Sequence, residues 1–287
     1  MKHELIFCIL CAWIVTCCSS SGSSTGPDAD FEPFIAPSPS SAADTFVAPA
    51  GQSLIWADEF DGEGINLDNW SYETEQNGTW SHSWNNEWQR YTDNDTGGPN
   101  ASINDGVLVI RALKTNGGDG GYTSARLVTK GKHSWRYGTI VARMQLPYGQ
   151  GIWPAFWMLG VYGEWPANGE IDIMEMIGGE INDNTTHATI HWLDGTQISE
   201  GDSYVHDTKL ADDWHYYKLT WTENSMTFWF DDVVVFTGDI SSPAMSEFHQ
   251  PFYLLLNLAV GGGWPGPPDV TTEFPQHLYV DWVRVYQ

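Results

Sequence analysis

Three acidic residues stand close together in the segment Gly-Glu-Ile-Asp-Ile-Met-Glu-Met-Ile-Gly at positions 169–178: Glu170, Asp172 and Glu175. The residues between them are branched or large and apolar, which favours a β-strand. Because strand side chains alternate between two faces, Glu170 and Asp172 should share one face, and strict alternation would place Glu175 on the other. An acid on the apolar face costs several kcal/mol unless it is paired. A β-bulge around 173–175 would bring all three acids onto one face.

The spacing of the outer acids suggests a reaction. With strand steps of about 3.3 Å, the Cα atoms of Glu170 and Glu175 would lie roughly 13 Å apart. Side chains that lean together could bring the two carboxylates to about 5–6 Å, near the spacing of a retaining glycosidase. Asp172 would hydrogen-bond one or both and hold their pKa values apart. A solvated acidic strand explains the spacing equally well, so the acids alone leave both interpretations open.

Tryptophans surround these acids. The chain contains 16 Trp in 287 residues, and many of them lie among Gly, Asn and Asp instead of inside apolar runs. Trp153 and Trp157 lie upstream of the acids, and Trp165 leads directly into them. Aromatic faces stack on the apolar C–H face of a sugar ring. We therefore predict that these three tryptophans contact a carbohydrate.

The elements that must position these residues are predicted to be strands. Segments with strand patterns recur between Gly, Asn and Asp, as in an antiparallel sandwich, and the clearest are 107–112, 138–145, 216–222, 226–230 and 278–286. The pair Asp231 and Asp232 predicts a hairpin turn. No long amphipathic helix and no internal repeat is evident.

The acid run is one of several motifs that together resemble the laminarinase branch of glycoside hydrolase family 16. Besides the acids, the motifs are Asn-Asn-Glu-Trp-Gln-Arg-Tyr-Thr at 85–92, Trp-Pro-Ala-Phe-Trp at 153–157, Asn-Leu-Ala-Val-Gly-Gly at 257–262 and Val-Asp-Trp-Val-Arg-Val-Tyr at 280–286. The resemblance covers about residues 51–287. Separate motifs in the right order are a more specific signal than the acid run alone.

The resemblance implies an all-β fold, a concanavalin A-like β-jelly-roll sandwich with a concave substrate cleft. Carried over by position, Glu170 would be the nucleophile, Asp172 the assisting acid and Glu175 the general acid/base. Such family members are typically endo-β-1,3-glucanases, which cut laminarin-like glucans with retention and need no cofactor for catalysis. The two residues between Asp172 and Glu175 match the bulged subgroup, which also contains agarases and carrageenases.

The resemblance also assigns substrate contacts beyond the tryptophans. Asn85 and Asn257 begin two of the shared motifs and are expected to bind sugar. His191 lies in a segment that resembles the strand beside the acids, where it would contact sugar or the acid/base; a packed polar histidine is the plainer alternative. His187 and His191 could suggest a zinc pair, but no third ligand with the usual spacing stands nearby, so zinc is not expected.

Two alternative functions stay open. One is a family 16 hydrolase of mixed-linkage β-glucan or of an algal galactan. The other is a β-glucan-binding protein without turnover, because a lectin of similar fold would show the same strand pattern. The intact set of acids favours an enzyme over a binding protein.

A calcium ion is often bound on the convex face in this family. The matching positions are Glu59 and Gly106 through backbone oxygens and Asp281 through its carboxylate, and oxygen ligands of this kind suit Ca²⁺. Its expected role is stability, since the retaining mechanism needs no metal. Asp281 could equally be an ordinary exposed strand residue.

The charge of the chain limits its partners. Lys and Arg number 12 against 37 Asp and Glu, which gives a formal net charge of −25. Such a field repels nucleic acid and anionic membranes, and it argues mildly against sulfated galactans. A neutral β-glucan polysaccharide fits better, and we expect a monomer.

The N-terminal part differs from the rest. Residues 1–18 have the length and apolar character of a signal peptide, and they hold all four cysteines. Cys17 or Cys18, followed by serines, resembles a bacterial lipoprotein site, which would tether the protein to a membrane by a lipid anchor; plain cleavage is the alternative. Residues 19–50 have the composition of a flexible linker, and 51–287 form the expected catalytic domain. We therefore expect a secreted or outer-surface protein.

Overall fold

The computed structural model describes residues 43–74, 85–93, 100–115 and 121–287. The predicted signal peptide, the lipoprotein cysteines and most of the predicted linker lie outside these residues, so those predictions are not tested. No helix within the described ranges is long and apolar enough to cross a membrane.

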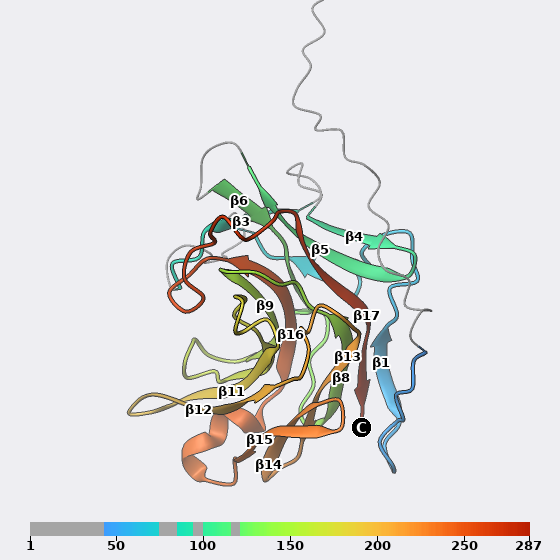
Figure 1. Cartoon of the computed structure of the whole chain (residues 1–287). Helices are drawn as coiled ribbons and strands as arrows, with labels where there is room; N and C mark the ends of the chain where they lie inside the picture. The colour runs from blue at the N-terminus through green and yellow to red at the C-terminus, as the bar shows by residue number, and fades with distance from the viewer. Residues whose placement is uncertain (1–42, 75–84, 94–99, 116–120) are drawn as a thin grey trace, which may run out of the picture. The chain divides into compact units, whose positions relative to one another are not determined.

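Nearly all the regular structure is β-strand, arranged in two sheets (Figure 1). The larger sheet has the strand order β15 (Val233–Asp239), β14 (Ser225–Phe230), β13 (His215–Trp221), β8 (Gly138–Gln145), β17 (Gln276–Tyr286), β5 (Val107–Lys114), β6 (Tyr122–Ser124) and β3 (Gln89–Tyr91). Strand β1 (Leu54–Asp58) pairs with β17, and β4 (Ala101–Asn104) pairs with β5. Only β3 and β6 are parallel among the described pairs.

The smaller sheet carries the acid run. Its strand order is β12 (Thr196–Val205), β11 (Thr185–Asp194), β10 (Glu170–Glu175), β9 (Ile152–Gly160), β16 (Phe252–Val260), β7 (Arg126–Val128) and β2 (Ser71–Tyr72). Neighbouring strands are antiparallel. A short 3₁₀ helix, η4 (Pro243–His249), precedes β16.

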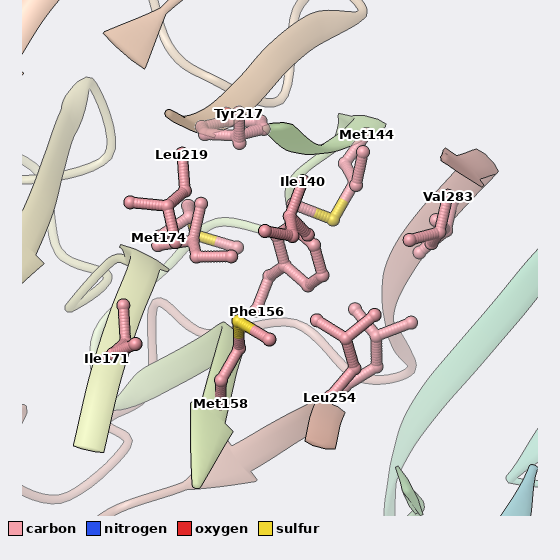
Figure 2. Close-up of a cluster of buried hydrophobic side chains, with 14 of the residues drawn as sticks. Ile140, Met144, Phe156, Met158, Ile171, Met174, Tyr217, Leu219, Leu254 and Val283 are labelled. Carbon is pink, nitrogen blue, oxygen red and sulfur yellow. The ribbon is translucent and has the colours of Figure 1, made fainter. Parts of the chain in front are cut away.

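The core lies between the two sheets, where alternate side chains of each strand meet. Figure 2 shows part of it, with labelled residues that include Phe156, Met158, Ile171, Met174 and Leu254 from the smaller sheet and Ile140, Met144, Leu219 and Val283 from the larger. Neighbouring residues on β16, such as Leu255, pack in a separate cluster on the opposite face. Burial of apolar surface, worth roughly 25 cal/mol per Å², therefore fixes which side chains of the smaller sheet face outward.

The predicted all-β jelly-roll sandwich is confirmed. The predicted strand 138–145 coincides with β8, and the other predicted strands overlap β5, β13, β14 and β17. The hairpin turn predicted at the Asp pair joins β14 to β15, with Asp231 at a φ of 49°.

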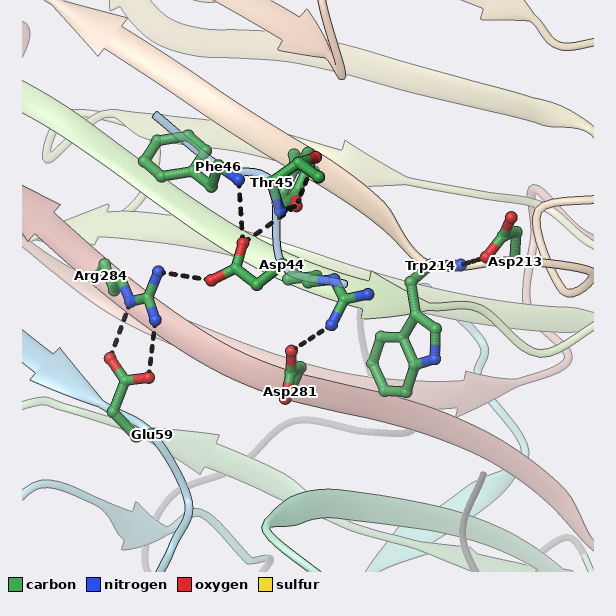
Figure 3. Close-up of polar contacts among 10 residues, drawn as sticks. Asp44, Thr45, Phe46, Glu59, Asp213, Trp214, Asp281 and Arg284 are labelled. Atoms are coloured by element: carbon green, nitrogen blue, oxygen red, sulfur yellow. Dashed lines mark hydrogen bonds and ion pairs between the residues drawn. The ribbon is translucent and has the colours of Figure 1, made fainter. Parts of the chain in front are cut away.

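The beginning of the described chain packs on the outer face of the larger sheet (Figure 3). The Asp44 carboxylate accepts hydrogen bonds from Arg284 Nη1 at 3.0 Å and from the Tyr216 hydroxyl at 3.0 Å. The same guanidinium donates twice to Glu59, at 2.7 and 2.8 Å, and stacks 3.9 Å from the centre of the Trp282 ring. One arginine thus joins three elements.

Phe46 adds an apolar contact to this attachment. Its ring centre lies 5.4 Å from that of Trp282, 5.5 Å from that of Tyr216 and 5.9 Å from that of Tyr286. We call residues 44–46 the strap. The strap lies within the segment predicted as a linker. A single acid and a single aromatic residue in a polar segment leave no periodic signal in the sequence, so this attachment was not predicted.

The strap should contribute to stability. Phe46→Ala removes a partly buried ring, and we expect it to lower the free energy of unfolding by about 1–2 kcal/mol and the Tm by a few degrees. The matched control is Val47→Ala, because Val47 is 83 % exposed. Thermal melts of both variants in the full chain test this, and equal Tm values for the two would contradict the attachment.

Candidate active site

Strand β10 contains the predicted bulge. Relative to β9 its register shifts between Asp172 and Met174, and relative to β11 it shifts between Asp172 and Glu175. Ile173 is the extra residue, and both Ile173 and Met174 are buried in the core. Two consecutive apolar side chains therefore face inward, which returns Glu175 to the outward face of Glu170 and Asp172.

A glycine allows the chain to enter β10 at this point. Gly169 has a φ of 73°, and a Cβ atom added to it would lie 2.9 Å from Cζ of Phe252. Both the backbone conformation and the close contact with a core ring favour glycine at this position. The loop that carries Trp165 is thereby joined tightly to the first acid.

Each outer acid accepts a hydrogen bond from an indole N–H. Trp165 Nε1 donates to Glu170 Oε2, and Trp153 Nε1 donates to Glu175 Oε1 at 2.9 Å. Trp153 lies on β9 and Trp165 lies in the loop before β10, so two separate segments orient the two carboxyl groups. The sequence predicted these tryptophans as sugar contacts, and their role as hydrogen-bond donors to the acids was not predicted.

The central acid is paired with a histidine. Asp172 is only 2 % exposed, and its Oδ2 lies 3.0 Å from Nε2 of His191. The other ring nitrogen of His191 lies 2.7 Å from Oγ of Ser199 on β12, which fixes the ring between two strands. Glu170, Asp172 and His191 form the single group in the described part of the chain whose side chains could together hold a metal ion. His187, the other half of the apparent zinc pair, is outside this group.

Burial raises the pKa of all three acids. It raises the pKa of Glu170 to about 8 with help from the charge of Asp172, and the pKa of Glu175 to about 7 with help from the charge of Glu170. Burial and the charge of Glu175 hold the pKa of Asp172 well above its usual range. The indole N–H groups and His191 act on the outer acids in the opposite direction. The cluster therefore retains protons near neutral pH and can offer an acid beside a carboxylate.

Two other residues that were predicted to contact sugar, Trp157 and Asn257, pair with each other beside the acids. Together with Tyr91 we call them the floor. Trp157 Nε1 donates to Oδ1 of Asn257 at 2.7 Å, and Nδ2 of Asn257 donates to the Tyr91 hydroxyl at 3.2 Å. Asn257 is 4 % exposed, so its amide supports Trp157 and Tyr91. The Arg126 guanidinium lies 5.4 Å from the ring centre of Trp157 and closes the floor on this side.

Asn85 is exposed near this floor, and its Nδ2 donates to Glu87 Oε1 at 3.1 Å. The structure also brings in residues that the sequence did not single out. Trp264 meets Trp153 edge-on, with ring centres 5.6 Å apart, and its position among glycines and a proline was the signal available for it. A shallow pocket beside the acids is lined by His187, Thr189, Ser199, Glu200, Gly201, Asp202, Ser203 and Trp264.

The residues predicted to bind calcium lie away from the acids. Asp281 Oδ2 accepts a hydrogen bond from Arg143 Nη1 at 2.6 Å, and its other oxygen has no hydrogen-bond partner among the described residues. The Glu59 side chain binds Arg284, which leaves its backbone oxygen, the predicted ligand atom, unaffected. Gly106 lies in the turn between β4 and β5. The second oxygen of Asp281 is thus left for a cation, and calcium stays a prediction.

Comparisons with known proteins agree on one family. Residues 69–284 match the model of glycosyl hydrolases family 16. The chain is 41 % identical to a β-glucanase of Rhodothermus marinus, over 82 % of this chain and 85 % of that protein. It is 35 % identical to glucan endo-1,3-β-glucosidase A1 of Niallia circulans, over 84 % of this chain but only 38 % of that longer protein. The solved catalytic domain of an endo-1,3-β-glucanase (laminarinase) from Thermotoga petrophila superposes with a TM-score of 0.73 at 38 % identity, covering 82 % of this chain and 98 % of that one.

The raised pKa of Glu170 predicts a pH-dependent effect on stability. A carboxyl group that binds its proton more tightly when folded destabilises the protein as pH rises from about 4.5 towards about 8. Glu170→Gln should therefore be more stable than the wild type at pH 8, by on the order of 2 kcal/mol, and equal to it at pH 4. Thermal melts at both pH values test this, with the exposed Glu223→Gln as control. A stability difference that does not change with pH would contradict the raised pKa.

Proposed function

We propose, since the chain belongs to family 16 of the glycosyl hydrolases, that it is an endo-acting hydrolase of β-1,3-glucans that retains anomeric configuration. Relatives and solved structures named as endo-1,3-β-glucanases support this substrate class. The observation that carries the proposal is the bulge in β10, which gathers three carboxyl groups with raised pKa values on one face.

The proposed reaction assigns one role to each acid. Glu170 attacks the anomeric carbon while Glu175 gives its proton to the leaving glycosidic oxygen, and Glu175 then takes a proton from the water that hydrolyses the glycosyl-enzyme. The Trp165 indole N–H favours the charged form of Glu170. Asp172, held beside His191, is the assisting acid, and its charge acts on the protonation of Glu170.

The substrate is proposed to lie across the outward face of the smaller sheet. Trp153 and Trp157 are half-buried there, so each keeps some ring surface available for a sugar. Trp264, which is 44 % exposed, extends this aromatic surface toward the pocket of β11 and β12. His191 is proposed to contact sugar beside Asp172, and Asn85 to contact it near Trp264.

The glycosidic linkage that is cleaved is a more specific part of the proposal. The relative from Rhodothermus marinus is named only as a β-glucanase, so mixed-linkage β-glucan is the second candidate substrate. The net charge of −25 disfavours a sulfated galactan, which would be repelled from the protein. A neutral β-1,3-glucan would not be repelled by this charge.

The deciding experiment measures reducing-sugar release from laminarin, lichenan, agarose and carrageenan. We expect cleavage of laminarin in preference to the other three, with β-configured reducing ends as the first product seen by NMR. Glu170→Ser should lose this activity by several orders of magnitude, because no nucleophile remains. The control Glu223→Ser removes an exposed acid from the turn between β13 and β14 and should cleave laminarin like the wild type.

Two results would overturn the assignment. Laminarin cleavage by Glu170→Ser at the wild-type rate would exclude Glu170 as the nucleophile. A first product with α configuration would exclude retention. Preferred cleavage of lichenan would keep the family and the acids but change the substrate to mixed-linkage glucan.

Calcium, location and oligomeric state are also proposals. The serine-rich segment after Cys18 and the predicted signal peptide favour a secreted or surface-anchored protein, and we propose that it is a monomer. Calcium would be held through Asp281 and the backbone oxygens of Glu59 and Gly106, and it would act on stability alone.

The calcium proposal has a direct test. If the ion is bound, adding Ca²⁺ to chelator-treated protein should raise the Tm by a few degrees, since a ligand that binds only the folded state stabilises it. Asp281→Asn should reduce that response. A thermal melt that is the same with chelator and with Ca²⁺ would rule out a stabilising calcium site.

A further inference from the structure

A fourth acid, Glu87, is buried beside the catalytic cluster. It is only 6 % exposed, and it lies in the motif at 85–92 just before β3. We propose that Glu87 is a positioning residue for the reaction proposed above, one that ties the motif to the floor and favours the acid form of Glu175. This inference rests on the proposed function, because it assigns the proton donor to Glu175.

Three donors converge on the Glu87 carboxylate. Asn85 Nδ2 donates to Oε1 at 3.1 Å, while Gln89 Nε2 at 2.6 Å and the Tyr91 hydroxyl at 3.3 Å donate to Oε2. All three donors belong to the same short motif. A buried carboxylate needs such donors, and a segment with alternate residues bound to one group is held in a single conformation.

The network continues from the motif into the floor. Oε1 of Gln89 accepts a hydrogen bond from the backbone N–H of Val260 at 2.7 Å. Tyr91 accepts one from Asn257, whose own oxygen accepts from Trp157. Glu87 therefore helps to hold the C-terminal part of β16 in place, and through Asn257 also Trp157 on β9.

The motif also lies against the tryptophan that holds Glu175. The backbone oxygen of Asn85 accepts a hydrogen bond from the N–H of Gly263 at 2.6 Å. A Cβ atom added to Gly262 would lie 3.2 Å from that same oxygen and 3.2 Å from the Trp153 ring. Trp153, thus backed by this loop, donates to Glu175. A shift of the motif would move the donor of this hydrogen bond.

The charge of Glu87 also favours the protonated form of Glu175. Within the described residues Glu87 forms no ion pair. Arg126, which is paired with Glu73, also interacts with Glu87 through its charge. The titratable groups that face Glu175 are Glu170 and Asp172 on its own strand, His187 and His191 on β11, and Glu87. Burial and the charge of Glu170 contribute most to the raised pKa of Glu175, and the charge of Glu87 adds to them.

The test is the pH profile of kcat/KM on laminarin for Glu87→Gln. Removing a negative charge lowers the pKa of a neighbouring acid, so the alkaline limb, where Glu175 loses its proton, should move to lower pH by roughly half a unit. We also expect kcat/KM at the optimum to fall about 10-fold, since Gln offers one oxygen where three donors converge.

The matched control is Asp58→Asn. Asp58 is likewise buried, at 8 % exposure, and accepts hydrogen bonds from Asn69, Trp70 and the N–H of Phe60, but it lies on β1 in the other sheet. The Asp58→Asn variant should lower the Tm as Glu87→Gln does, but it should leave the alkaline limb of the kcat/KM profile in place. A limb that stays in place in Glu87→Gln, whatever happens to its rate, would overturn the inference.

A second measurement separates this inference from the proposed function. The ¹³C signal of the Glu175 carboxyl group can be titrated in the wild type and in Glu87→Gln without any turnover. A lower pKa in the variant would support the role of Glu87 even if laminarin were not the substrate, and an unchanged pKa would refute it. Failure of laminarin cleavage in the wild type would instead count against the proposed function alone.

Discussion

The desolvation of three carboxyl groups on one strand is the constraint on which the site depends. A strand of strict alternation would bury Glu175 in the core, where an unpaired acid costs several kcal/mol. The bulge avoids this by turning both Ile173 and Met174 inward. The apolar residues between the acids are therefore as necessary to the site as the acids, because their burial fixes which face of β10 the carboxyl groups occupy.

Indole N–H groups moderate this constraint without removing it. A lysine or arginine beside the acids would pair with them and lower their pKa values, leaving no proton to donate. Trp153 and Trp165 provide single neutral hydrogen bonds instead, so the pKa values of Glu170 and Glu175 stay raised. Their rings can at the same time border the sugar site. Arg126, a cation beside the floor, is held by Glu73 and by the rings of Tyr91 and Trp157.

The sequence predicted the features that follow a strand pattern, and also the one position that breaks such a pattern. Strand-like composition between turn residues identified 138–145 and 278–286 as two strands of the larger sheet, and the one acid out of step, Glu175, identified the bulge. Single contacts between distant segments leave no such pattern. Asp44 and Arg284 are 240 residues apart, and nothing in either neighbourhood indicates that they meet. Glu87 was visible in a motif, but its burial depends on donors whose orientation only the fold determines.

The two faces of the sandwich meet different demands, and this explains where their charges are paired. On the outer face of the larger sheet, acids are neutralised by guanidinium groups: Glu59 and Asp44 by Arg284, and Asp281 by Arg143. On the outward face of the smaller sheet, the described donors to Glu170, Asp172, Glu175 and Glu87 are neutral groups and one histidine. Paired charges there would be more stable but unable to exchange protons. The low stability of an acid cluster without cations is thus a requirement of its chemistry, and the well-packed core beneath Ile171 and Met174 is what allows the fold to tolerate it.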